Sequence, residues 1–130
     1  EEETFEYGDI HKLIGAGKRR IPVVHSGTDL EVQFSERDNR TINIRWNTLQ
    51  TTHGIVDLLS ENGAVRVAAG ATNFSDITDP MVFRFPRHYA RLHKGEIAIV
   101  KPSNTTFCVL IKLLELYDND ILFQWEVRND

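Results

Sequence analysis

The sequence is poor in cysteine and has no long hydrophobic run. Cys108 is the single cysteine among 130 residues, which excludes an internal disulfide and leaves nothing to indicate secretion. A membrane-spanning helix needs roughly 20 consecutive apolar residues, whereas apolar runs such as residues 97–100 and 109–111 are far shorter. The opening Glu1-Glu2-Glu3 is the opposite of the basic and then apolar start of a signal peptide. We therefore expect a cytoplasmic protein with no membrane partner.

The sequence also has no motif of a catalytic or metal-binding site. Its five histidines include no pair at the spacing of a helical zinc motif, and its serines have no nucleophile-elbow context. Asp29 and Glu31 loosely resemble the acidic pair of metal-dependent nucleases, but Gln33 follows where those enzymes have a lysine. Cys108 lies in an apolar stretch, as expected for a buried core thiol. We expect no catalytic residue, no metal and no cofactor in this chain.

Composition and charge indicate one globular domain with two local clusters of cations. A content of 41% hydrophobic and 26% charged residues excludes a disordered chain. The formal net charge of −4 argues against general binding to polyanions. Cations nevertheless follow one another directly after Gly17, and residues 84–94 contain four cations and no acid. These segments supply the candidate phosphate contacts Lys18, Arg19, Arg20, Arg87, Arg91 and Lys94.

Alternation of apolar and polar residues predicts that most of the chain is β-structure. Residues 29–36 and 41–46 alternate on either side of a turn-forming Arg37-Asp38-Asn39, which predicts a hairpin. Residues 121–128 alternate in the same way and predict a last strand. Two short helices are predicted as well. They cover residues 51–62, which have apolar residues at helical spacing before Gly63, and residues 87–93, which follow Pro86 and precede Gly95.

These elements predict a mainly β (α+β) fold, a closed or half-closed antiparallel barrel of seven or eight strands with two short helices. Residues 1–17 are expected to form a loosely ordered lead-in, and residues 18–130 a single β-barrel-like domain. The glycines at 15 and 17 would make residues 18–20 a flexible basic arm of the kind that follows nucleic-acid backbone. Such a stretch also occurs as a merely solubilising segment.

The polar face of the predicted hairpin carries side chains that suit base recognition. Amide and guanidinium groups match the paired donors and acceptors of base edges in the major groove. The alternative is an ordinary solvent-facing strand surface. The candidate base contacts are Gln33, Arg40, Asn43 and Arg45.

Two stretches resemble a known family of DNA-binding domains. Leu92-x-Lys94-Gly95-Glu96-Ile97-Ala98-Ile99-Val100, after a predicted short helix, is similar to a pattern near the end of the DNA-binding pseudobarrel of plant transcription factors. Arg40-Thr-Ile-Asn-Ile-Arg45-Trp46, with the later strand at residues 65–67, resembles the related recognition domain of some Type II restriction endonucleases. The likeness covers about half of the chain. The sequence departs from the plant version in lacking its basic opening strand.

The resemblance implies a seven- or eight-stranded antiparallel pseudobarrel that binds double-stranded DNA through arms beside a concave sheet. The matching residues would be Arg40, Asn43 and Arg45 on one arm, and Arg87 with Arg91 near the second helix. The leading hypothesis is accordingly a duplex DNA recognition module, with the catalytic domain of a restriction or defence enzyme lying elsewhere. One alternative is a protein-interaction or assembly module that uses residues 70–85 or an edge strand. Another is a small ligand-binding barrel or enzyme, which would need an internal cavity.

Overall fold

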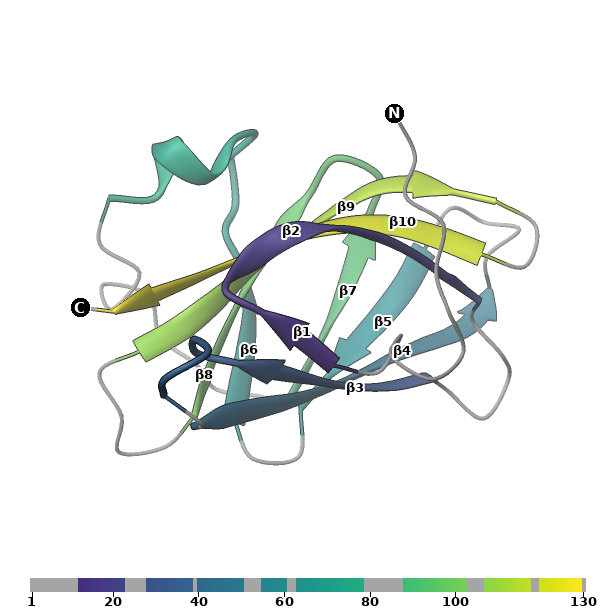
Figure 1. Ribbon diagram of the computed structural model, residues 1–130. Helices are drawn as coiled ribbons and strands as arrows, with labels where there is room; N and C mark the ends of the chain where they lie inside the picture. Colours follow the sequence, from purple (N-terminus) through teal and green to yellow (C-terminus); the bar gives the residue numbers. More distant parts are fainter. Residues whose placement is uncertain are drawn as a thin grey trace.

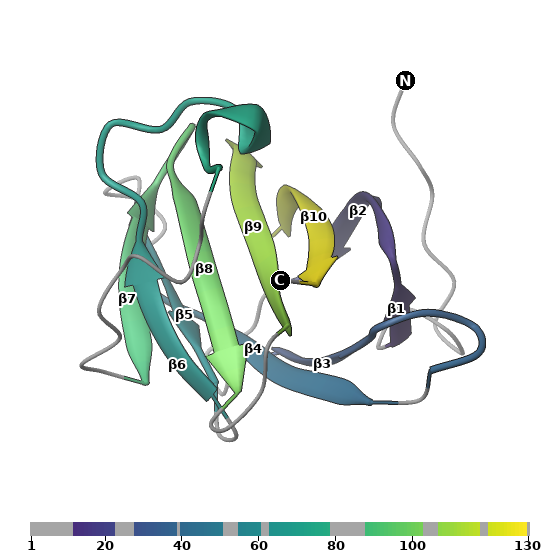
Figure 2. The same ribbon diagram turned by 90° about the vertical axis from the view of Figure 1, so that its left-hand side faces the viewer.

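The computed structural model describes residues 12–22, 28–38, 40–50, 55–60, 63–78, 88–102, 107–117 and 120–129, with the backbone alone for residues 48–50 and 129. Within them the chain forms two five-stranded sheets that face one another (Figure 1, Figure 2). Sheet A has the order β1 (Lys12–Ile14), β3 (Thr28–Gln33), β4 (Thr41–Gln50), β5 (Ile55–Leu59) and β7 (Tyr89–His93). Sheet B has the order β2 (Ala16–Pro22), β10 (Asp120–Asn129), β9 (Phe107–Leu116), β8 (Ile97–Pro102) and β6 (Gly63–Val67).

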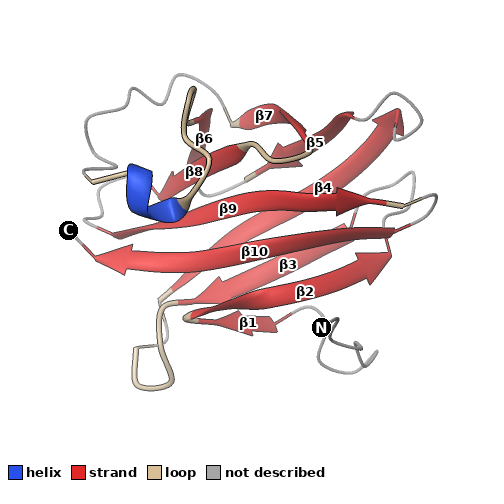
Figure 3. Cartoon of the chain, turned by 90° about the horizontal axis from the view of Figure 1, so that it is seen from above, coloured by secondary structure: helices blue, strands red, loops and turns tan. Residues whose placement is uncertain are grey.

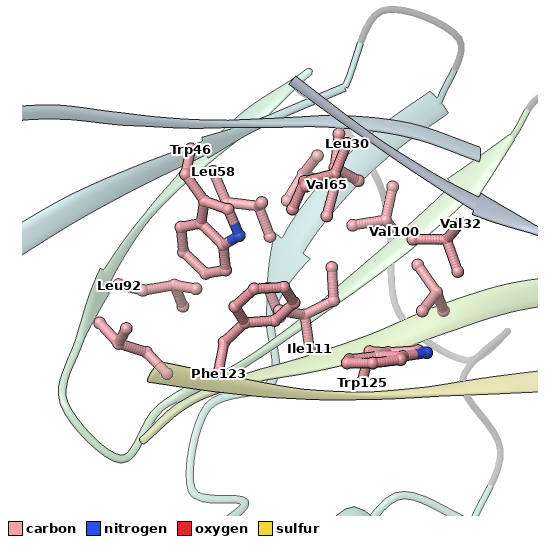
Figure 4. Packing of buried hydrophobic residues seen from close by; sticks show 14 of the residues in the cluster. Leu30, Val32, Trp46, Leu58, Val65, Leu92, Val100, Ile111, Phe123 and Trp125 are labelled. Atoms are coloured by element: carbon pink, nitrogen blue, oxygen red, sulfur yellow. The ribbon is translucent and has the colours of Figure 1, made fainter. Parts of the chain in front are cut away.

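The hydrophobic core lies between the two sheets. In the hairpin of β3 and β4, every second side chain is buried, and Leu30 lies opposite Ile44 on the inward face. Trp46 of sheet A and Phe123 of sheet B point toward each other, with ring centroids 5.4 Å apart (Figure 4). Because successive side chains of a strand point to opposite faces, the predicted alternation in this hairpin and in β10 is confirmed.

One continuous stretch of chain passes from sheet A to sheet B at Gly15. Its amide donates to the carbonyl oxygen of Gln33 in β3 at 3.2 Å, and its own carbonyl accepts from the amide of Val127 in β10 at 2.8 Å. Gly15 has φ +69°, a left-handed conformation that glycine adopts without steric cost. On either side of it, β1 pairs with β3 in parallel and β2 pairs with β10 in antiparallel orientation.

This passage corrects two expectations about the start of the chain. Residues 12–17 lie in β1, the turn at Gly15 and the beginning of β2, whereas they were expected to belong to a loosely ordered lead-in. Residues 18–20 are paired along β10, so the predicted flexible basic arm is wrong. The remaining residues of the expected lead-in, 1–11, lie outside the described residues.

The first predicted helix, residues 51–62, is also wrong. β5 occupies residues 55–59, between β4 and β7, and Gly63 begins β6 where it was expected to end a helix. Val56 and Leu58 are buried between the sheets, whereas Ile55 and Leu59 are half-buried on the other face. Apolar residues on both faces of a strand produced the i, i+3, i+4 spacing that was interpreted as helical.

The second predicted helix, residues 87–93, is replaced by β7. Ala90 and Leu92 of this strand are buried, and Tyr89, Arg91 and His93, which alternate with them, are exposed. Residue 87 of this prediction lies outside the described residues. The mainly β class is confirmed, but the described chain has ten strands in two facing sheets where a seven- or eight-stranded pseudobarrel with two short helices was expected. Its one helical segment is a single 3-10 turn (Phe74–Asp76), and no helix in the described ranges is long and apolar enough to cross a membrane.

A segment that we call the strap, residues 68–78, covers part of the outer face of sheet B. Phe74 and Ile77 of the strap are buried and belong to a small apolar cluster on β8 and β9 that is separate from the core between the sheets. Figure 3 shows the 3-10 turn of the strap beside these strands. Sheet B is thus covered by apolar contacts on both sides.

Candidate functional site

The outer face of sheet A is the surface on which chemistry-bearing side chains gather. The strand registers direct alternate residues away from the core on all five strands. These outward residues are Lys12, Ile14, Asp29, Glu31, Gln33, Thr41, Asn43, Arg45, Asn47, Ile55, Asp57, Leu59, Tyr89, Arg91 and His93. We call this set the sheet A face.

Charges on the sheet A face are paired across neighbouring strands. Arg45 holds Asp29 with two hydrogen bonds, from Nε to Oδ1 at 2.6 Å and from Nη2 to Oδ2 at 3.0 Å. Arg91 Nε lies 3.3 Å from Oδ1 of Asp57. Glu31 lies beside Lys12 in the register of β3 and β1. Cations on β1, β4 and β7 therefore alternate with acids on β3 and β5, so the described face has no cationic excess.

Two large apolar side chains on the sheet A face are open to solvent. Ile14 is 44% exposed and Tyr89 is 39% exposed, and they are the large hydrophobic residues of the described chain that remain exposed. Tyr89 lies opposite Leu59, which in turn lies opposite Arg45. An aromatic ring, an aliphatic side chain and a guanidinium group thus form one row across β7, β5 and β4.

Three of the four predicted base contacts lie on this face. Asn43 is exposed, Arg45 is held by Asp29, and the Gln33 amide donates to the carbonyl oxygen of Ser35 at 2.6 Å. The predicted phosphate contact Arg91 lies on the same face.

The fourth predicted base contact, Arg40, lies at the end of the hairpin instead. Its guanidinium carbon is 5.0 Å from the ring centroid of Phe34 and 4.6 Å from that of Phe107. Asp38 accepts hydrogen bonds from Arg40 Nε at 2.9 Å and Nη2 at 2.6 Å. Arg40 therefore covers one end of the core, and its guanidinium group is already hydrogen-bonded to Asp38.

The other predicted phosphate contacts are spread over different parts of the molecule. Lys18 and Arg20 point to the outer face of sheet B, where Arg20 pairs with Asp120 at 3.0 Å. Arg19 points to the core side, 5.9 Å from the ring centroid of Trp125. The six predicted phosphate contacts are not brought together on one face.

The last two of those six, Lys94 and Arg87, lie on either side of β7 in the sequence. Lys94 lies in the turn that follows the strand and pairs with Glu115 at 2.9 Å. Arg87 lies outside the described residues.

Two described carboxyl groups have a lowered pKa, and both have a structural cause. Side-chain hydrogen bonds from Arg40 hold the pKa of Asp38 below its ordinary value. Backbone amides of Thr72 and Asn73 do the same for the pKa of Asp76. Both groups lie in loops, where they stabilise the local backbone. In the described part of the chain, no three His, Cys, Asp or Glu side chains are grouped so that they could hold a metal ion.

Two features of the candidate surface were missed by sequence reasoning. Leu59 and Tyr89 were placed in predicted helices, which hid their position side by side on two paired strands. The strand-like alternation of residues 89–93 was the available signal. Conversely, Phe74 and Ile77 of the loop proposed as a protein interface are buried against the protein's own sheet B.

Comparisons with known proteins give no relative from which a function could be transferred. No family model matches the chain, and neither a curated protein nor a solved structure matches it.

Proposed function

We propose that this chain is a protein-binding module and that the sheet A face is its binding surface. The observation that carries the proposal is the exposed Tyr89 beside Leu59, within a set of balanced ion pairs. Protein interfaces are enriched in aromatic residues and arginine, and a few such residues supply most of the binding energy. Tyr89, Arg45 and Arg91 are the residues of this kind on the face.

The charge pattern favours a protein over a polyanion as the partner. Each described arginine on the face has an acidic partner, Asp29 for Arg45 and Asp57 for Arg91. A phosphate backbone would have to compete with these carboxylates, and binding to nucleic acid depends on a net excess of cations. A protein surface with charges of both signs can instead extend the alternating pairs of the sheet. The partner expected is therefore a protein of mixed surface charge.

Site-specific photo-crosslinking in cells tests this proposal. A photoreactive amino acid at position 89 would lie on the sheet A face, and the same amino acid at position 124 would lie on the outer face of sheet B. We expect a discrete crosslinked protein from position 89 and none of that mass from position 124. Crosslinks that are equal from both positions would contradict a specific sheet A surface.

The affinity of the captured partner gives the quantitative check. Truncation of a hot-spot residue costs about 2 kcal/mol or more, so Tyr89→Ala should raise the Kd of the purified pair by about 30-fold. Lys18→Ala, on the opposite face, should leave the Kd unchanged. An unchanged Kd for Tyr89→Ala would exclude this residue from the interface.

Duplex DNA recognition is the second candidate, favoured by one observation. Gln33, Asn43, Arg45 and Arg91 share one face, although they are distant in sequence. In this candidate function the chain is the recognition domain of a restriction or defence enzyme whose catalytic domain lies elsewhere. Arginine and amide side chains on one sheet could read base edges, each good pair contributing roughly 1–3 kcal/mol of discrimination.

Fluorescence anisotropy with a pool of random duplexes, at low and near-physiological salt, separates the two candidates. DNA recognition requires salt-sensitive binding that is weakened by Arg45→Ala and Arg91→Ala more than by Lys18→Ala and Arg20→Ala. Absence of binding at low salt would exclude DNA as the partner of this domain and leave the protein-binding proposal intact.

A further inference from the structure

The strap has the features of a small unit that can move independently of the sandwich. Phe74 and Ile77 bury their side chains against sheet B in a cluster that does not merge with the core between the sheets. The sheet side of that cluster is formed by Ile97, Ile99, Cys108 and Leu110. Loss of these contacts would leave the larger cluster, with Trp46 and Phe123, intact.

Two side chains of sheet B hold the middle of the strap. Arg128 Nη2 donates to the carbonyl oxygen of Phe74 at 2.7 Å, and Nη1 of the same guanidinium donates to that of Ile77. Lys112 Nζ donates to the carbonyl oxygen of Thr72 at 2.5 Å. Between Thr72 and Ile77 the strap is therefore fastened to sheet B by side-chain donors, and at its start the amide of Ala68 donates to the carbonyl oxygen of Ile97 at 2.8 Å. Each strand of the sheets is held instead by a ladder of backbone hydrogen bonds.

The strap is also braced internally. The carboxylate of Asp76 accepts hydrogen bonds from the amides of Thr72 and Asn73, both at 3.0 Å. The amide of Ile77 donates to the carbonyl oxygen of Phe74 at 3.1 Å. These bonds are made within the strap, so they would survive if it left the sheet as one piece.

We propose that the strap opens as a unit while the two sheets stay folded, and that opening uncovers the Cys108 thiol with the apolar strip around it. Proteins open locally in contiguous units whose free energies are smaller than that of global unfolding. The strap meets this description because its apolar cluster is separate from the core between the sheets. Opening would present a second apolar surface on sheet B, on the side of the molecule away from the sheet A face.

Thiol labelling tests the proposal directly, since Cys108 is the single cysteine of the sequence. Labelling by N-ethylmaleimide is followed by mass spectrometry over a range of low urea concentrations. We expect a labelling rate that is nearly independent of urea at first and rises steeply only where global unfolding takes over. Little surface is exposed in a local opening, so its dependence on denaturant is weak.

Arg128→Ala is the variant that tests whether the strap controls labelling of Cys108, and Arg20→Ala is its matched control. Both arginines lie on the outer face of sheet B and pair with an acid, Glu126 or Asp120. Arg128 also donates to two carbonyl oxygens of the strap, whereas Arg20 lies in β2, at the edge of the sheet away from β8. Loss of hydrogen bonds from a charged donor should speed labelling by at least about tenfold. Arg20→Ala should not change the labelling rate at low urea. Because the bonds from Arg128 to the strap are absent from both the open and the unfolded state, Arg128→Ala should also lower the urea midpoint of tryptophan fluorescence, while its labelling rate at low urea stays nearly independent of urea.

Two results would overturn the proposal. One is a wild-type labelling rate with the same steep urea dependence as global unfolding at every concentration, which would mean that Cys108 is reached only in the unfolded chain. The other is an equal acceleration by Arg128→Ala and Arg20→Ala, which would mean that the anchors of the strap do not control access to the thiol.

Discussion

Gly17 illustrates how one residue can be dictated by the space beside it. A Cβ at this position in β2 would lie 2.8 Å from Cη2 of Trp125, a side chain that is almost fully buried. The indole occupies the room that any other residue type would need. Glycine here makes close packing possible, whereas at Gly15 it permits the backbone conformation.

We predict that Gly17→Ala destabilises the fold by about 1–3 kcal/mol, the usual cost of forcing an extra group into a packed core. Urea unfolding followed by tryptophan fluorescence measures the loss. Ala16→Val is the matched control, because Ala16 is exposed in the same strand. A Gly17→Ala midpoint equal to that of wild type would show that Trp125 can shift at no cost.

Asp76 gives a pH-dependent prediction at the same scale. Its folded pKa lies below the ordinary value of 3.8 because the Thr72 and Asn73 amides donate to the carboxylate. The stabilisation of the strap is therefore fully present above pH 3.8 and is lost as the pH falls through the folded pKa. Asp76→Asn should weaken the strap at neutral pH, and its difference from wild type should disappear in acid.

Amide hydrogen exchange in residues 72–77 measures that difference, and NMR titration of the carboxyl carbon gives the pKa itself. A titration midpoint at or above 3.8 would contradict the assigned hydrogen bonds. Equal exchange in wild type and Asp76→Asn at neutral pH would show that the carboxylate does not brace the strap.

The turn between β1 and β2, through which the chain passes from sheet A to sheet B, depends on Gly15. Both of its backbone groups are used, one in each sheet, and its φ of +69° disfavours residues with a side chain. No neighbouring atom lies within 4 Å of a Cβ built there, so the cost of substitution comes from backbone conformation alone. Gly15→Ala should lower the free energy of unfolding by about 1–2 kcal/mol.

Gly15→Asn provides the control for this prediction, because asparagine tolerates the left-handed region better than alanine does. Chemical denaturation should rank the three proteins as wild type, then Gly15→Asn, then Gly15→Ala. Equal stability of the alanine variant would mean that the chain can pass between the sheets in another conformation.

Strands with one buried face were predictable from sequence, and strands with apolar residues on both faces were not. In β10, Phe123 and Trp125 alternate with Gln124 and Glu126, so the pattern has one interpretation. In β5, Val56 and Leu58 are buried while Leu59 on the other face packs beside Tyr89. The pairing of β5 with β4 and β7 decided its conformation, and no local signal contains that pairing.

The same limit explains why the predicted DNA contacts lie on different faces of the molecule. Alternation assigns each side chain to one of two faces of its strand, but it does not say which sheet the strand joins. Lys18 and Arg45 are both outward-facing, yet β2 and β4 belong to opposite layers. The carboxylates that hold Arg45 and Arg91 come from β3 and β5, and those partners follow only from the strand order.

The whole molecule is built from pairings between distant parts of the chain. Arg20 and Asp120, which are 100 residues apart, form an ion pair across neighbouring strands of sheet B. Folds dominated by such non-local contacts pay for loop closure before the contacts form, and typically fold in milliseconds to seconds. We predict this range for refolding from urea.

Stopped-flow fluorescence of Trp46 and Trp125, which are both buried in the core, provides the measurement. Double-jump mixing removes slow phases from proline isomerisation, since the sequence has four prolines. Recovery of the full native signal within the mixing time would contradict a folding reaction limited by non-local pairing.

The position of β10 in sheet B, next to the edge strand β2, has a consequence for synthesis of the protein on the ribosome. β10 lies between β2 and β9, so β2 leaves the ribosome with no partner strand to receive it. At about 5–20 residues per second of translation, β2 waits on the order of 5–20 s for β10, longer than the expected folding time. Throughout that interval β2 has no strand to pair with, and the core lacks the side chains of β10. The pace of translation, and any chaperone that shields the waiting strand, would therefore govern how much of this protein reaches its native state in the cell.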